Sequence, residues 1–412
     1  EAGVVDRRVA RGAALDPLAS PLIGYDLVDP GTTGGEDGLH LRIGGHKLIL
    51  RGDDSDLNAD IAVMRPGALL RRLFWRGDLG FAEAFIAGEW TSNDPAALLE
   101  LLAVNLDAYE PSDRRSRLTQ LAVGVRHWLN RNNRRGSRRN IAAHYDLGNE
   151  FYAQWLDPTM SYSSAVFDRA STPDETLADA QQRKYARMLE MIDPKPGETV
   201  LDSGCGWGGF AEYAAGRGVR VIGLTLSQEQ LAYAQARLQR AGLADLADLR
   251  LCDYRDFTGQ VDHVVSIEMF EAVGREYWAG YFDTLSRCLR PGGRAALQVI
   301  TIDESYFTAY AANPGGFIQT YIFPGGMLPT KGHLKRLSDD SGLRWRGMQG
   351  FGTDYADTLQ LWHQRFNRCT EWLEAHGYDR RFRRMWRYYL AFCEAGFRAR
   401  QIDVVHCLME KG

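Results

Sequence analysis

A glycine-rich turn between a short apolar segment and a helical pattern constrains this chain more than any other feature. The stretch from Val200 to Phe210 reads VLDSGCGWGGF. An apolar run that passes through an acid and several glycines into a helix predicts a strand, a tight turn and a helix N-terminus. Such a turn lets a ligand approach the backbone, and the helix end offers unpaired N–H groups. A ligand-binding turn is therefore predicted, with a turn that binds nothing as the alternative.

Residues around this turn distinguish between two nucleotide cofactors. The glycine spacing also satisfies the dinucleotide fingerprint, so the glycines alone do not identify the ligand. A nicotinamide site has an acid at the end of the second strand, whereas that strand here ends Gly223-Leu224-Thr225. Asp202, an acid just before the glycines, is typical of S-adenosylmethionine (SAM) methyltransferases, and Asp253-Tyr254-Arg255 after the third strand fits the adenine of SAM. SAM is therefore the predicted cofactor.

Strands alternate with helices in the second half of the chain. The predicted strands after the first span residues 219–224, 249–252, 261–267, 295–300 and 402–409. This alternation predicts an α/β fold with a doubly wound, Rossmann-like parallel sheet, to which the last strand is added antiparallel at the edge. Ligands on such sheets lie beyond the carboxyl ends of the strands. The polar residues at such ends are Asp202, Thr225, Asp253 and Glu268 or Glu271.

Three helical stretches carry specific expectations. Thr172-Pro173-Asp174-Glu175 predicts a capping box that opens a helix. One long helix is predicted from about Asp354 to His376, and another from Asp379 to about Arg398. The last of these carries five arginines beside Trp386, Tyr388 and Tyr389, namely Arg380, Arg381, Arg383, Arg384 and Arg387. Membrane contact and a solvated arginine face are both open for it.

The first part of the chain predicts a small separate domain. Residues 1–36 are expected to be loosely ordered, and residues 37–111 form a small α+β unit. That unit contains a hairpin from Leu39 to Leu50 and a strand at residues 60–64. One helical piece begins at residue 66, and two others span residues 81–90 and 95–106. It has no obvious catalytic set, so a packing or substrate-delivery role is preferred.

A basic linker is predicted at residues 112–140, before a catalytic domain at 141–412. The linker contains nine arginines together with Trp128 and Leu129. Such a segment can bind anionic lipid, with about 1 kcal/mol per cation near the surface, or can be a solvated connection. Nucleic acid is a weaker interpretation, because the chain has no base-reading motif and a net charge of −4.

Composition excludes several other classes of protein. Six scattered cysteines without a C-x-x-C pair fit reduced thiols in a cytoplasm, and nine dispersed histidines predict no metal site. No apolar run approaches the roughly 18 residues that a membrane span needs, and no signal peptide is recognisable. The expected location is the cytoplasm, peripheral at the inner face of the cell membrane.

From about His144 to the C-terminus the chain resembles the cyclopropane fatty acyl phospholipid synthases and the mycolic acid cyclopropane synthases. The shared motifs are HYD at 144–146, YS at 162–163, the turn at 202–209, GLTLS at 223–227, MFE at 269–271, YIFPGG at 321–326 and AGFRAR at 395–400. The resemblance implies a class I SAM-methyltransferase sheet with helical insertions. The N-terminal unit resembles, less closely, the lipid-carrier-like domain of the phospholipid-acting branch.

The resemblance also implies a chemistry. The methyl group of SAM is transferred to a cis double bond of a lipid acyl chain, and loss of a proton from the new methyl closes a cyclopropane. The implied SAM contacts are Tyr162, Ser163, Gly204, Gly206, Thr225, Leu226, Gln230, Tyr254 and Arg255. A bound bicarbonate is the family's proposed base, held by a cysteine, a glutamate, a histidine, a backbone isoleucine and a tyrosine. Glu271, Ile300 and Tyr321 match that set.

The chain departs from the family in the remaining positions. Ser164 stands for the cysteine, Gln298 for the histidine, and Ala272 for the usual histidine after Glu271. Serine and glutamine still donate hydrogen bonds, so bicarbonate remains an option, but neither titrates near neutrality. Glu268 stands three residues before Glu271, and a helical turn would point both into similar space.

These departures lead to a hypothesis about the product. Glu268, Glu271 or both replace or reposition the base, with Glu268 as a surface or salt-bridged acid as the alternative. A moved base would give a methylated or methylene-branched alkene, or a methylated diene on the way to a furan fatty acid, instead of a ring. Two further alternatives are a silent lipid-binding homologue and a small-molecule methyltransferase.

The expected partners are an unsaturated phospholipid substrate and an anionic membrane surface, without nucleic acid; self-association is left open. One aromatic cluster is expected to line an acyl tunnel, with core packing as the alternative. It comprises Tyr306, Phe307, Tyr310, Phe317, Tyr321 and Phe323.

Overall fold

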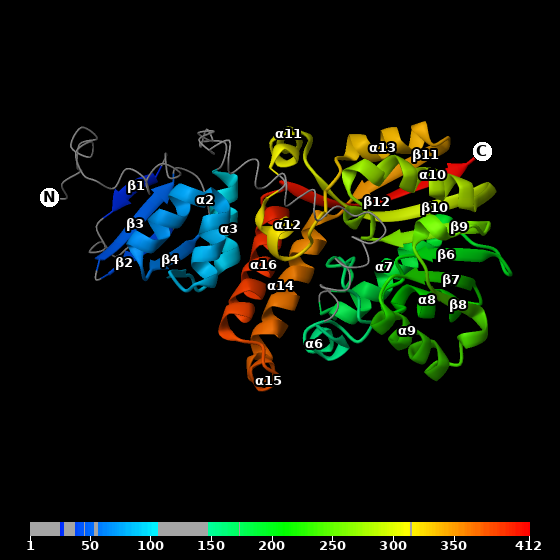
Figure 1. Ribbon diagram of the computed structural model, residues 1–412, viewed down its shortest axis with the longest axis horizontal. Helices are drawn as coiled ribbons and strands as arrows, with labels where there is room; N and C mark the ends of the chain where they lie inside the picture. Colours follow the sequence, from blue (N-terminus) through cyan, green and yellow to red (C-terminus); the bar gives the residue numbers. More distant parts are fainter. Residues whose placement is uncertain are drawn as a thin grey trace. The chain divides into compact units, whose positions relative to one another are not determined.

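The chain divides into two compact units, residues 1–115 and 116–412 (Figure 1). The computed structural model describes residues 25–28, 38–44, 46–52, 57–105, 147–172, 174–313 and 315–412. The basic linker and the motif at 144–146 lie outside the described residues, as does most of the N-terminal segment. Within that segment, Tyr25–Val28 forms a strand, β1, that the sequence did not predict.

The first unit is a five-stranded sheet with two helices. Its elements are β1 (Tyr25–Val28), β2 (Leu39–Ile43), β3 (His46–Gly52), β4 (Ala59–Val63), α2 (Pro66–Ile86), β5 (Trp90–Thr91) and α3 (Pro95–Val104). The strand order is β1-β3-β2-β4-β5, and β2 and β3 form the predicted hairpin. Ile61 and Val63 are two residues apart on β4 and are both buried, because every second side chain of a strand points to the same face, here the core.

Helix α2 bends at Gly77, which has φ +50° and ψ −131°. The sequence predicted separate helical pieces beginning at Pro66 and at Phe81, with the second ending at Trp90. In the structure both belong to α2, and Trp90 lies in β5, where it is fully buried against Phe81 and Phe85. The predicted end was wrong because an aromatic residue at helical spacing can equally fill the core from a strand.

The second unit is built on a seven-stranded sheet. Its strands are β6 (Thr199–Ser203), β7 (Arg220–Thr225), β8 (Ala247–Leu251), β9 (Val261–Ile267), β10 (Leu289–Ile302), β11 (Leu343–Gly350) and β12 (Ile402–Lys411). The order is β11-β12-β10-β9-β6-β7-β8, and the strands from β10 to β8 are parallel. This confirms the doubly wound α/β sheet. Strand β12 is antiparallel as predicted, but it is not at the edge, because β11 pairs with its other side.

Helices and short turns connect and cover these strands (Figure 1). The helices are α6 (Asn149–Ala153), α7 (Leu177–Ile192), α8 (Gly209–Ala215), α9 (Gln228–Arg240), α10 (Trp278–Cys288), α11 (Glu304–Ala312), α12 (Phe317–Tyr321), α13 (Lys331–Asp340), α14 (Gly352–Arg368), α15 (Thr370–Ala375) and α16 (Arg380–Arg398). The 3₁₀ turns are η4 (Ala244–Leu246), η5 (Tyr254–Asp256), η6 (Phe270–Ala272) and η7 (Arg275–Tyr277).

Two helix boundaries differ from the prediction. Helix α7 begins after Thr176 rather than Thr172, because Thr176 and Asp179 form the capping box. The predicted helix over 354–376 is interrupted at Cys369, so that α14 and α15 are separate.

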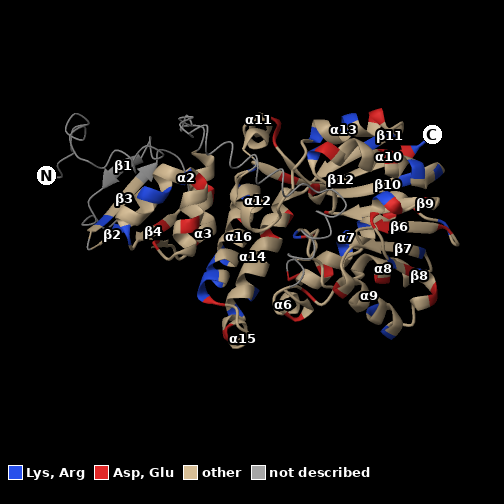
Figure 2. Ribbon diagram, viewed as in Figure 1, with Lys and Arg blue, Asp and Glu red and all other residues tan. Residues whose placement is uncertain are grey.

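Helices α14 and α16 lie side by side (Figure 1). Large aromatic side chains of the two helices pack on one another. Trp362 and Trp386 are almost completely buried, and both rings pack on Trp155. Figure 2 shows basic residues on the first turns of α16, where Arg383 pairs with Glu374. Within the described ranges no helix is long and apolar enough to cross a membrane, and no group of acids, histidines or cysteines could hold a metal ion.

Candidate active site

The glycine turn links the ends of β6, β7 and β9. The N–H groups of Gly204 and Cys205 both donate to the carbonyl oxygen of Leu224, at 3.1 and 2.9 Å. Gly204 has φ +93°, and a Cβ there would lie 2.8 Å from the side chain of Met269. Glycine is therefore required both by the backbone conformation and by the close approach of the loop after β9. The turn also includes Gly206, at φ +51°.

Asp202 lies at the carboxyl end of β6 with an unsatisfied oxygen. The residue is 2 % exposed, and its Oδ2 is buried without a hydrogen-bond partner among the described residues. Burial raises the pKa of this carboxyl to about 7. Buried polar atoms are normally paired, so an orphaned oxygen suits a ligand that carries a donor or a positive charge. The ammonium group of SAM's amino-acid part meets that requirement.

The predicted SAM contacts at the next two strand ends are held by neighbouring side chains. Thr225 donates through Oγ1 to Oε1 of Gln230 at 3.0 Å, and Ser227 caps α9 as predicted. After β8, both carboxylate oxygens of Asp253 accept hydrogen bonds from the side chain of Arg255. Asp253 therefore positions Arg255 in this arrangement.

Two further predicted contacts flank these residues. Leu226 follows β7 directly. Tyr254 packs edge-on against Tyr281, and burial raises its pKa to about 12.

The loop Tyr162–Ser164, called the cofactor loop below, runs between the predicted SAM contacts and the carboxylates of Glu268 and Glu271. The hydroxyls of Tyr162 and Tyr389 are 2.8 Å apart. Ser163 Oγ accepts a hydrogen bond from Lys184 Nζ at 2.6 Å, and Ser164 N donates to Glu268 Oε1 at 2.8 Å. Each residue of this short segment therefore contacts a different structural element.

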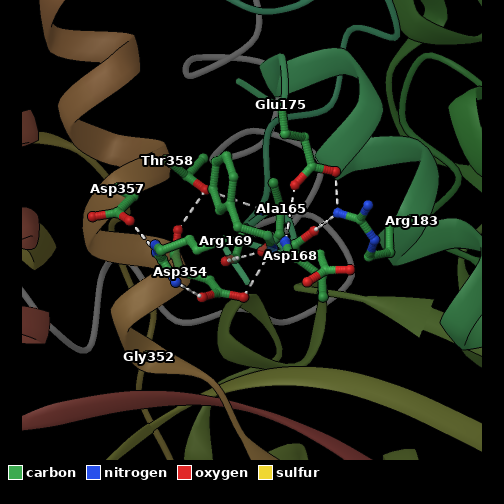
Figure 3. Close-up of polar contacts among 12 residues, drawn as sticks. Ala165, Asp168, Arg169, Glu175, Arg183, Gly352, Asp354, Asp357 and Thr358 are labelled. Carbon is green, nitrogen blue, oxygen red and sulfur yellow. Dashed lines mark hydrogen bonds and ion pairs between the residues drawn. The ribbon is translucent and has the colours of Figure 1, made fainter. Parts of the chain in front are cut away.

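The chain beyond Ser164 is fixed to α14 (Figure 3). Ala165 N donates to Thr358 Oγ1 at 3.1 Å, and Asp354 accepts from Phe167 N and from Arg169, each at 3.0 Å. Arg169 also pairs with Asp357. A segment tied to α14 at several points holds Ser164 in a defined place beside Glu268.

Glu268 accepts three hydrogen bonds. Its Oε1 accepts from Ser164 N at 2.8 Å and from Gln298 Nε2 at 2.7 Å, and its Oε2 accepts from Tyr355 Oη at 2.6 Å. Its backbone has φ +50°, a conformation that few non-glycine residues adopt. The pKa of Glu268 is raised, because burial outweighs the three donors and the charge of Lys184, which lower it. Such strain tends to occur at functional sites.

Gln298 is held in one orientation by a buried histidine. His406 Nε2 lies 2.7 Å from Gln298 Oε1, and burial holds the pKa of His406 well below its usual range. The neutral ring therefore donates through Nε2. The Gln298 amide nitrogen then points toward Glu268 and the carbonyl oxygen of Ser164.

Glu271 presents one free carboxylate oxygen. Its Oε1 accepts a hydrogen bond from Ile300 N at 2.5 Å, while Oε2 is buried without a partner in the described part of the chain. Burial, and then the charge of Glu268, raise the pKa of Glu271 to about 8. The charge of Glu268 thus acts on Glu271. The predicted helical turn from Glu268 is absent, because η6 begins only at Phe270.

The predicted tunnel aromatics fall into two groups. Tyr321 ends α12 and packs on Phe317, whose ring contacts Tyr388 of α16. Phe323 faces the rings of Tyr162 and Tyr389 at 6.5 and 6.3 Å.

The remaining members lie on α11. Phe307 packs on His333, and Tyr306 also belongs to this helix. The charge of Glu271 contributes to raising the pKa of Tyr310, after burial.

Three contributors to this site were not predicted. They are Lys184, Tyr355 and His406. Lys184 gives a local signal, because it shares a helical spacing with the buried Gln181 and Met188 on one face of α7. Tyr355 and His406 give none, since they reach the site only through the packing of α14 and β12.

The sequence model of the family described as "Mycolic acid cyclopropane synthetase" matches residues 132–407. The chain belongs to this family. It is 41 % identical over 347 residues to "Tuberculostearic acid methyltransferase UfaA1" of Mycobacterium tuberculosis, covering 83 % of this chain and 81 % of that protein. It is 35 % identical over 364 residues to "Cyclopropane-fatty-acyl-phospholipid synthase" of Escherichia coli, covering 86 % and 88 %.

A solved structure extends the match to the cofactor. The mycolic acid cyclopropane synthase CmaA1 complexed with SAH and CTAB superposes with a TM-score of 0.62 at 32 % identity, covering 66 % of this chain and 98 % of that one. The class I SAM-methyltransferase fold is thereby confirmed, and the chain is a SAM-dependent enzyme of lipid methylation or cyclopropanation. Family membership covers both reactions.

Proposed function

We propose that this enzyme transfers the methyl group of SAM to a double-bond carbon of an unsaturated fatty acyl chain in membrane phospholipid, and that the resulting cation loses a proton without closing a ring. The product is a methyl- or methylene-branched alkene. In this proposal the enzyme acts from the cytoplasmic face of the membrane, with the arginines of α16 near the anionic surface.

The carboxylate of Glu268 carries this proposal. Its Oε1 engages Ser164 N and Gln298 Nε2, from the two positions where the resemblance places a cysteine and a histidine around bicarbonate. Ile300 N, a third expected donor, is engaged by Glu271. The protein's own carboxylates thus occupy these donors, so the residues present do not fit a bicarbonate. The proposal assigns bicarbonate no step.

The two glutamates are assigned different tasks. SAM, when bound, supplies an electrophilic methyl group. As the methyl carbon bonds to one alkene carbon, the neighbouring carbon becomes positive, and the Glu268 carboxylate stabilises this charge in a buried site. Glu271 Oε2, which has no other partner among the described residues, accepts the proton.

The proton comes from a carbon next to the cationic centre, directly or after a 1,2-hydride shift. The C–H electron pair becomes a new C=C bond. Of the two glutamates that the hypothesis allowed, Glu271 is the better placed to act as the base, because three donors already occupy Glu268.

The named relatives support a lipid substrate. One is a tuberculostearic acid methyltransferase and another a cyclopropane-fatty-acyl-phospholipid synthase. The higher identity is to the protein named a methyltransferase. Both names concern fatty acyl chains, which favours a lipid over a small soluble acceptor.

Product analysis with labelled SAM tests the proposal. Purified protein is incubated with SAM carrying a CD₃ group and with mono-unsaturated phospholipid vesicles, and the released fatty acids are analysed by gas chromatography and mass spectrometry before and after catalytic hydrogenation. We expect one added carbon with a double bond that takes up hydrogen under conditions that leave cyclopropanes intact. Three retained deuteriums indicate proton loss from the chain, and two indicate a methylene branch.

Other outcomes contradict the proposal. A product with one added carbon and no reducible double bond is a cyclopropane, and the family's ring-forming reaction is then retained. SAH formation without lipid identifies a small-molecule methyltransferase. The Glu271→Gln protein, assayed in parallel, controls for contaminating activity.

A further inference from the structure

Lys184 is a buried cation that the proposed reaction does not yet use. It lies on α7 with no exposed surface and is among the largest fully buried side chains of the described residues. Its Nζ donates to Ser163 Oγ and lies 4.9 Å from the centre of the Tyr185 ring. A neutral hydroxyl and an aromatic face do not balance a buried ammonium, so its charge requires acids nearby.

Two acids act on Lys184. Burial lowers its pKa to about 8, against the charges of Glu268 and then Asp157. The Asp157 carboxylate caps the following turn by accepting from Thr159 N at 2.9 Å and Ser161 N at 3.4 Å. The charge of Lys184 also contributes, after burial and Arg187, to lowering the pKa of His406 of β12. Of these two acids, Glu268 thus raises the pKa of Lys184 the more.

The surroundings of Glu268 give the same pairing. Its three hydrogen-bond donors are neutral groups, from Ser164, Gln298 and Tyr355. The nearby ionisable group on its own loop is the second acid, Glu271, whose pKa the charge of Glu268 helps to raise. Lys184 supplies the positive charge that acts on it.

We propose that Lys184 is a positioning residue that keeps Glu268 ionised beside the reacting carbons while holding Ser163 of the cofactor loop. This inference rests on the proposed function, in which Glu268 is a fixed negative charge. Without the ammonium, the half-buried Glu268 takes up a proton and no longer stabilises a cation. Lys184 thereby connects the cofactor loop to the charge at the lipid end of the site.

The pH dependence of SAH release tests this role with Lys184→Met, which keeps the length of the side chain and removes the charge. In the wild type, Glu271 and Lys184 both titrate near pH 8, so kcat should pass through a narrow maximum there, rising as Glu271 loses its proton and falling on the alkaline side as Lys184 loses its proton. We expect the variant to lose the alkaline limb and about 30-fold in kcat at pH 7, with a smaller change in the KM for SAM.

A merely structural lysine predicts a different result. The rate would then fall by one factor at every pH, with the alkaline limb unchanged, and that outcome would overturn the proposal. Lys195→Met is the matched control, because Lys195 lies just beyond α7 and is mostly exposed. SAH is released whichever lipid product forms, so this profile is independent of the product analysis.

Thermal unfolding keeps the proposal testable if Lys184→Met is poorly active. Lys184→Met and Glu268→Gln each remove one of two opposite charges that act on each other, and each should lower the melting temperature. The double variant removes both charges and should melt above the value expected from adding the two single effects. Strict additivity would mean that the two side chains do not interact, and would refute the pairing.

Discussion

Asp202 and Glu268 are carboxylates at the ends of neighbouring strands, β6 and β9, and the protein surrounds them in opposite ways. Asp202 has an oxygen without a hydrogen-bond partner among the described residues, and burial alone raises its pKa. Glu268 accepts three hydrogen bonds and lies near a buried lysine. One carboxylate is left for a ligand, and the other is satisfied by the protein.

This difference in surroundings assigns Asp202 to cofactor binding and Glu268 to catalysis. An unsatisfied buried acid is unfavourable in the free enzyme and becomes favourable when a cationic ligand arrives, so Asp202 suits SAM binding. A satisfied, fixed carboxylate needs no rearrangement when charge develops, so Glu268 suits stabilisation of a transient cation. Glu271 lies between these cases, because one oxygen is held by Ile300 and the other is free among the described residues.

The largest effect is expected from Glu271→Gln. If its free oxygen accepts the proton, the amide should lower kcat by about 10³-fold, within the usual range for loss of a general base. SAM affinity, measured by calorimetry, should change little.

Stability provides the control for Glu271. Its raised pKa means that the stability it contributes is complete below the unfolded value of 4.5 and lost as pH rises through about 8. The amide variant should therefore unfold at the same or a higher temperature at pH 9. A Glu271→Gln variant that stays fully active would show that another residue accepts the proton.

Glu268→Gln should have the second largest effect. Glutamine keeps the shape and accepts hydrogen bonds through one oxygen, but it removes the negative charge beside the reacting carbons. We expect kcat to fall about 10²-fold with SAM binding retained. An unchanged rate and product would show that Glu268 is structural, and the contrast with Asp202 would then concern stability alone.

Much of the cofactor end could be predicted from sequence because its signals are local. The strand, the acid Asp202 and the glycines follow one another in the chain, and parallel strands bring Thr225 and Asp253 to the same edge. The helix boundaries at Thr176 and Cys369 were missed because competing caps and breaks are decided by small energy differences.

The part of the site around Glu268 and Glu271, where the lipid is proposed to react, could be predicted only in part. Glu268 and Glu271 stood out by their spacing, although a left-handed residue rather than a helical turn brings them together. Tyr355 is 87 residues from its partner Glu268, and His406 is 108 residues from Gln298. No local pattern encodes such contacts, which arise from the packing of α14 and β12 against the sheet.

Asp202→Asn tests whether the unsatisfied carboxylate of Asp202 destabilises the free enzyme and binds SAM. Folding raises the pKa of Asp202 to about 7, so its contribution to stability is complete below pH 3.8 and lost as pH rises through 7. The variant should therefore melt about 3 °C above the wild type at pH 8 without SAM, by less at pH 5, and no higher at pH 3. SAM affinity should fall about 10-fold.

Asp253→Asn is the matched control for Asp202. Asp253 is equally buried, but its carboxylate is paired with Arg255. Removing that charge should lower the melting temperature at pH 8. If both variants shift in the same direction, the difference in their surroundings does not determine their energetics.

The smallest effect is expected from Tyr355→Phe, which removes one of the three donors to Glu268. Two donors and Lys184 remain, so the carboxylate should stay ionised at neutral pH and kcat should fall only about 5-fold. The loss should grow as pH falls, because the pKa of Glu268 rises when a donor is removed. Tyr378→Phe is the control, since its hydroxyl donates to the backbone of Leu147 away from both glutamates. A loss of kcat as large as that of Glu268→Gln would mean that Tyr355 contacts the reacting groups itself. A loss of kcat that is equal at all pH values would mean that Tyr355 does not influence the ionisation of Glu268.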